Sequence, residues 1–85
     1  MMNNKILVIL YVPMIEKEYN CFIPLGKKVQ NVINLLSKAL YEMNDSNFDL
    51  EHNHSLYIKE TGKEVNKNIR IKDSSIKNAT ELILI

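Results

Sequence analysis

The chain of 85 residues is poor in several residue types, and each shortage excludes a class of protein. Its one cysteine, Cys21, excludes an internal disulfide framework and suits a reducing compartment, so we expect a cytoplasmic location. Its two glycines, Gly26 and Gly62, are too few for a phosphate-binding loop. The longest apolar stretch, residues 6–14, is far shorter than the roughly 20 residues of a membrane-spanning helix, and no signal-peptide cleavage site follows it.

An excess of one charge is also missing. Eleven basic and ten acidic side chains leave a net charge of +1, without the basic footprint of a nucleic-acid binder, so we expect no nucleic-acid partner. The composition, with 46% hydrophobic and 25% charged residues, is that of a soluble globular protein. The length suits a single domain, residues 1–85.

Hydrophobic periodicity predicts strands around one helix. The first strand, Lys5–Val12, is apolar on both alternating faces, and a second strand over residues 18–24 completes a hairpin with it. Apolar residues at a spacing of 3.6 predict a helix that begins at Val29 and ends at Asn44. Further strands are predicted over residues 55–59, around 64–65 and over 81–85.

Two stretches flank the predicted helix. Before it, Gly26 is the expected cap, and Lys27 and Lys28 are interpreted as solvated surface lysines rather than as an anion site. After it, residues 44–54 form a polar loop that we expect to return Phe48 and Leu50 to the core.

This order of elements is that of the β-grasp fold, an α+β fold in which a mixed sheet of four to five strands wraps one helix. Residues 62–85 align without a gap on the last part of ubiquitin, so the chain resembles ubiquitin-like proteins. The shared residues are Gly62, Lys63, Val65, Ile71, Asp73, Ile76 and Thr80. In this region, Ile71 and Ile76 are expected to pack on the core while Asp73 caps backbone donors of the turn.

The first half is most similar to the small YukD/EsaB-type proteins of type VII secretion systems in Gram-positive bacteria. The similarity rests on Ile23 and Pro24 at the end of the second strand, on a helix that opens at Val29 five residues later, and on the chain length. The resemblance implies a cytoplasmic accessory or regulatory protein that binds secretion components or other proteins.

The chain departs from ubiquitin at its end. Conjugating and sulfur-carrying members of the fold use a flexible tail ending in two glycines, whereas this sequence ends at Ile85, in or beside the last predicted strand. We therefore expect non-covalent binding. A stand-alone β-grasp adapter unrelated to secretion is the main alternative, and a protein modifier or sulfur carrier is a weaker one.

The residues do not predict an enzyme, a metal site or a cofactor. Cys21 lies in a strand, where a small buried hydrophobe is its usual role. The grouped ligand types Asp49, Glu51, His52 and His54 lie in a polar loop, with no fixed element to hold them around a cation.

A candidate protein-binding face follows from the alternation of the strands. If Leu82 and Leu84 face the helix, as the resemblance implies, Ile83 and Ile85 face outward beside the outer residues of the first and third strands. The predicted face consists of Leu7, Ile9, Tyr11, Tyr57, Ile83 and Ile85. We expect it to dock a partner or a second copy of the chain. The alternatives are a cover formed by residues 1–4 or by the hairpin loop, or tolerated scattered apolar residues.

Overall fold

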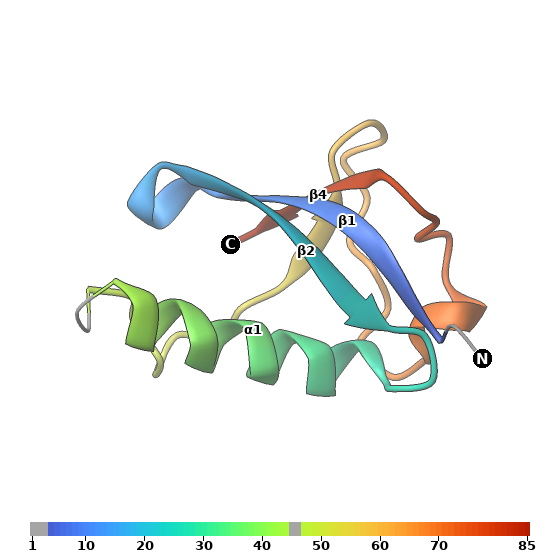
Figure 1. Ribbon diagram of the computed structural model, residues 1–85, viewed down its shortest axis with the longest axis horizontal. Helices are drawn as coiled ribbons and strands as arrows, with labels where there is room; N and C mark the ends of the chain where they lie inside the picture. The colour runs from blue at the N-terminus through green and yellow to red at the C-terminus, as the bar shows by residue number, and fades with distance from the viewer. Residues whose placement is uncertain (1–3, 45–46) are drawn as a thin grey trace.

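The computed structural model describes residues 4–44 and 47–85, in which one helix packs against one face of a four-stranded sheet (Figure 1). The strands are β1 (Lys5–Val12), β2 (Lys17–Pro24), β3 (Leu56–Ile58) and β4 (Thr80–Leu84), and the helix is α1 (Val29–Met43). Two 3-10 helices, η1 (Pro13–Ile15) and η2 (Ile71–Asp73), lie in the connections.

The order of strands across the sheet is β2-β1-β4-β3. The strand β1 pairs antiparallel with β2 and parallel with β4, and β3 pairs antiparallel with β4. Parallel neighbours cannot be joined by a tight turn, and the long connection between β1 and β4 contains α1. The predicted position of the last strand, beside the first and the third, is confirmed.

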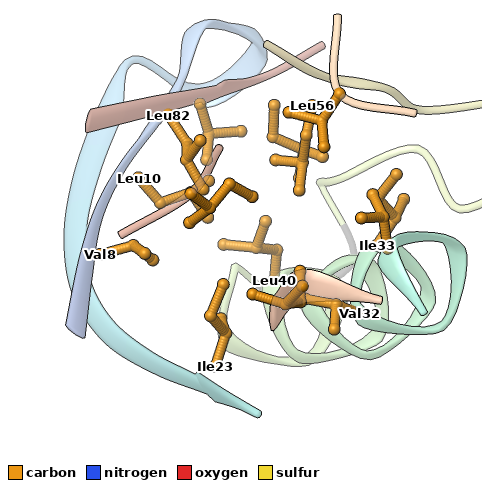
Figure 2. Packing of buried hydrophobic residues seen from close by; sticks show 14 of the residues in the cluster. Val8, Leu10, Ile23, Val32, Ile33, Leu40, Leu56 and Leu82 are labelled. Carbon is orange, nitrogen blue, oxygen red and sulfur yellow. The ribbon is translucent and has the colours of Figure 1, made fainter. Parts of the chain in front are cut away.

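The core lies between the sheet and α1. The strands contribute alternate residues to it, and the helix contributes the residues along one side. Figure 2 shows Val8, Leu10 and Leu82 from the sheet, and Val32, Ile33 and Leu40 from the helix. Val8, Leu10 and Leu82 are at most 1% exposed, because residues two apart in a strand share a face and here that face is covered by α1.

The helix begins at Val29, as predicted, but its cap differs from the prediction. Lys28, not Gly26, is the N-cap residue, and it makes no side-chain capping hydrogen bond. The segment before η2 supplies acceptors instead: the Val29 N–H donates to the Ile69 oxygen at 2.8 Å and the Gln30 N–H to the Lys67 oxygen at 3.0 Å. Free N–H groups of the first turn are thus satisfied by residues that are distant in sequence.

The predicted strand around residues 64–65 is wrong, because Glu64 forms only an isolated bridge with Tyr57. The predicted cap at Asp73 is also wrong. The Ser74 Oγ performs that role, accepting the Ile76 N–H at 3.1 Å and donating to the Ile71 oxygen at 2.6 Å. The expected burial of Ile71 and Ile76 is confirmed.

The loop between α1 and β3 returns one of its two large apolar side chains to the core. Phe48 is buried, whereas Leu50 is 44% exposed, so the prediction is correct for Phe48 and wrong for Leu50. The His54 ring occupies the space beside Phe48 and stacks on it with centroids 4.5 Å apart. The loop therefore contributes Phe48 and His54 to the buried region, and not Leu50.

Candidate protein-binding face

The sheet face that points away from α1, here called the outer face, carries the residues that the sequence singled out. In β1 the core side takes Val8, Leu10 and Val12, so Leu7, Ile9 and Tyr11 lie on the outer face. In Figure 1, α1 lies on the opposite side of the sheet. Within residues 4–44 and 47–85, α1 therefore does not cover the outer face, and the alternative of a cover by residues 1–4 falls mostly outside the described residues.

The strand register joins three of these residues in one row. Tyr11 is opposite Ile83 in the pairing of β1 with β4, and Ile83 is opposite Tyr57 in the pairing of β4 with β3. Neighbouring strands of a sheet lie about 4.8 Å apart, so these three directly opposite side chains are neighbours. Two aromatic rings therefore flank an isoleucine at the centre of the outer face.

The remaining predicted residues extend this row along the strands. Leu7 and Ile9 precede Tyr11 at alternate positions of β1, and Ile85 follows Ile83 on the same side. Tyr11 is 37% and Ile85 is 52% exposed, and the other four predicted residues are partly exposed.

Sequence reasoning missed Phe22, which is opposite Leu7 in the hairpin and 68% exposed. The signal was present in the alternation of the second strand, where Tyr19, Cys21 and Ile23 form the inward set and leave Phe22 outward. An aromatic side chain so exposed lengthens the apolar surface towards β2.

Charged groups border the apolar row. Glu18 is opposite Tyr11 on one side, and Glu64 is opposite Tyr57 on the other. An ion pair lies two residues further along, where Lys59 Nζ, two residues after Tyr57, is 3.8 Å from Oε1 of Glu81, two residues before Ile83. The outer face therefore has an apolar centre with a carboxylate at each end of its central row.

Cys21 lies on the opposite side of β2, towards α1, and burial raises the pKa of its thiol. A raised pKa lowers the fraction of thiolate at neutral pH, which is the opposite of what activates a nucleophilic cysteine.

The loop residues considered as cation ligands serve the loop itself. The His54 ring donates through Nε2 to the Asp49 backbone oxygen at 2.7 Å, and the Asp49 carboxylate accepts the Glu51 N–H at 2.9 Å. Within the described part of the chain, no three histidine, cysteine, aspartate or glutamate side chains are grouped to hold a metal ion.

The last residue is tied to the sheet by its main chain. The Ile85 N–H donates to the Ser55 oxygen at 3.0 Å, and the Ser55 N–H donates to the Ile85 oxygen at 2.8 Å. This pairing continues the β3–β4 ladder by one step. Among residues 4–44 and 47–85, no helix has the length and apolar character needed to cross a membrane.

No family model matches the sequence, and no curated protein matches it either. The fold has many relatives among solved structures. One is the ubiquitin-like domain of the type VII secretion protein ECCD1 of Mycobacterium tuberculosis, at a TM-score of 0.73 and 11% identity, covering 99% of each chain.

Two further structures show the same fold. A chain from a study of molecular mimicry of SUMO that promotes DNA repair has a TM-score of 0.72 and 12% identity, over 100% of this chain and 95% of the other. The N-terminal ubiquitin-like domain of the 4931431F19Rik protein has a TM-score of 0.69 and 16% identity, over 99% and 76%. The chain therefore has the α+β, ubiquitin-like β-grasp fold.

Proposed function

We propose that this chain is a non-covalent protein-interaction domain that docks a partner on its outer face. The observation that carries the proposal is the row Tyr11, Ile83 and Tyr57, formed by three different strands. Contiguous exposed apolar patches on small soluble proteins mark interaction sites, and aromatic residues are enriched at the centres of interfaces.

The border of the row indicates the chemistry of the partner. Glu18 and Glu64 stand at opposite ends of it, so a complementary surface has an apolar centre with basic groups on either side. Four strand spacings separate these two carboxylates, which is about 19 Å. A partner segment that engages both ends is therefore several helical turns or a small domain surface, not a single side chain.

The similarity to the ECCD1 domain supports a more specific role for the chain. We propose an accessory or regulatory component of a type VII-like secretion system, in the cytoplasm. An adapter unconnected to secretion is the competing role. The gene's neighbourhood discriminates the two, because a secretion ATPase and small helical substrates encoded nearby are expected only for the first.

We propose no catalytic step and no covalent attachment. Mass spectrometry of the cellular protein checks it, and a covalent adduct through Ile85 contradicts it.

The face is tested by placing charge at its centre. The double variant Ile9→Lys/Ile83→Lys is expected to lose the proteins that the unmodified chain captures from its own cells, because two ammonium groups enter the apolar interface. Leu35→Lys is the matched control, since Leu35 is 52% exposed on α1, away from the outer face. Identical capture by the double variant and the control, with both folded, excludes the outer face as the docking site.

A further inference from the structure

The sheet has two edges, and they are protected differently. At the β3 edge the following segment folds back: the Val65 N–H donates to the Leu56 oxygen at 2.8 Å, and the Ile58 N–H donates to the Lys63 oxygen at 2.9 Å. At the β2 edge no comparable segment is present among residues 4–44 and 47–85. An unpaired edge is a template for another strand.

The register identifies which backbone groups of β2 point to the open edge. Residues of an antiparallel pair alternate between hydrogen-bonded and non-hydrogen-bonded positions. The Leu25 N–H donates to the Asn4 oxygen, so, counting back along the ladder, the odd-numbered residues of β2 bond to β1. The even-numbered residues Glu18, Asn20 and Phe22 therefore direct their N–H and C=O groups outward.

Two independent details agree with this assignment. Pro24 occupies the next outward position, where a residue without an N–H leaves the β1 ladder intact. Leu7, which is opposite Phe22, turns its own backbone to the other side: its N–H donates to Asn78 Oδ1 at 3.0 Å and its oxygen accepts the Ala79 N–H at 2.7 Å.

The middle of the open edge lacks the features that usually prevent pairing, because Lys17 and Pro24 stand only at its two ends. The strand β2 is eight residues long and stays in register with β1 along its whole length, without a bulge. Its central residues 19–23 include no lysine and no proline, which are common guards of natural edges. The strand is also held in place at one end, because Lys17 Nζ donates to Asn44 Oδ1 at 2.7 Å and Asn44 Nδ2 to the Tyr19 hydroxyl at 3.3 Å.

An apolar groove runs beside this edge, between β2 and α1. Its lining includes Asn20 and the apolar or partly apolar residues Leu10, Tyr19, Cys21, Leu36, Ala39, Leu40 and Met43. The Met43 side chain is 62% exposed. A strand added to the edge would direct every second side chain towards this groove.

We propose that a second copy of this chain occupies the edge, with β2 antiparallel to β2 about a twofold axis at Asn20. The N–H groups of Glu18, Asn20 and Phe22 then meet the carbonyl oxygens of Phe22, Asn20 and Glu18 of the second copy. Each outward N–H finds an acceptor, so the edge is self-complementary, as a twofold interface requires. The two sheets become one continuous sheet.

Charge favours the antiparallel orientation. Glu16 and Glu18 lie at the hairpin end of β2, and Lys27 and Lys28 follow its other end, in the turn before α1 (Figure 1). Lys17 lies between the two glutamates and keeps its positive charge, so the hairpin end carries one net negative charge. Antiparallel pairing brings the acidic end of each copy towards the basic turn of the other, whereas parallel pairing sets like charges side by side.

The first test needs no variant. Amide hydrogen exchange of the whole chain is measured by NMR in a dilution series, with sedimentation equilibrium at the same concentrations. Dimerisation is expected to slow exchange of the Glu18, Asn20 and Phe22 amides by at least about tenfold, while the Tyr19 and Cys21 amides, which bond to β1, change little. A monomer at every concentration up to about 1 mM, or no concentration dependence at the even-numbered amides, overturns the proposal.

The second test removes one outward donor. Asn20→Pro deletes an N–H that does not bond to β1, so the fold is retained, and the dimer dissociation constant is expected to rise at least about tenfold. Asn20→Ala keeps the N–H and is the matched control. This inference is independent of the proposed function: a dimer that survives Asn20→Pro but is lost in Ile9→Lys/Ile83→Lys assigns self-association to the outer face and rejects the β2 edge.

Discussion

The turn over residues 71–76, in the connection before β4, is capped by the side chain of a single residue. The sequence indicated a capped turn over residues 71–76, and the turn is present, but Ser74 rather than Asp73 supplies the capping oxygen. Both side chains suit such a turn chemically, and they are adjacent. Which one bonds depends on the backbone angles set by η2, and these were not evident from the pattern.

The role of Ser74 gives a prediction at this scale. Ser74→Ala removes an acceptor of the Ile76 N–H and a donor to the Ile71 oxygen, so the free energy of unfolding is expected to fall by about 1–2 kcal/mol. Asp73→Ala is expected to change it by less than about 0.5 kcal/mol, since Asp73 is exposed. Urea denaturation followed by circular dichroism measures both, and the reverse order of the two effects would contradict the assignment.

The two glycines provide a second matched pair. Gly62 has a φ of +72°, and a Cβ at either glycine would meet nothing within 4 Å, so only backbone strain separates the two sites. Gly62→Ala is expected to lower the free energy of unfolding by about 1–2 kcal/mol, whereas Gly26→Ala is expected to leave it unchanged or slightly raised. Equal stability of the two variants in a denaturant titration would contradict this explanation.

At the scale of elements, local pattern was sufficient for the helix and the four strands, but not for their connections, where it wrongly predicted a further strand around residues 64–65. The alternation in β1 and the 3.6 spacing in α1 depend on burial of one face, which the sequence records directly. The bridge at Glu64 and the acceptors at Ile69 and Lys67 depend on segments that meet only in the folded chain. Pairing between distant segments leaves little trace in a single sequence.

The N-cap of α1 gives a prediction about stability at the scale of an element. Lys28 places a positive charge at the positive end of the helix, and no acceptor for the Asn31 N–H is present among the described residues. Lys28→Asp supplies both a negative charge and a capping oxygen, so the free energy of unfolding is expected to rise by about 1 kcal/mol.

Lys28→Ala separates the two contributions, since it removes the charge without adding an oxygen. Its stability is expected to lie between those of the unmodified chain and Lys28→Asp. Thermal unfolding at low and at high salt is the measurement, because the charge contribution shrinks when it is screened. A lower free energy of unfolding for Lys28→Asp would contradict the prediction, because it would mean that the lysine stabilises the start of the helix.

At the scale of the molecule, the strand order determines the surface. Because β4 lies between β1 and β3, the outward residues Tyr11, Ile83 and Tyr57 come together, although they are far apart in sequence. The sequence predicted the members of this row once the β-grasp order was assumed. The outward position of Phe22 was present in the alternation of β2 but was missed. The flanking carboxylates were not predictable in this way, because they required the pairing partners of Tyr11 and Tyr57.

Site-specific photocrosslinking tests the central claim, that the outer face docks another protein, most directly. A photoreactive phenylalanine analogue replaces Tyr57 on the outer face in one variant and Leu35 on α1 in the other, and both are irradiated in the cells that make the protein. We predict a discrete crosslinked species of higher mass from position 57 and none from position 35. Crosslinking from position 35 with none from position 57 would contradict the account.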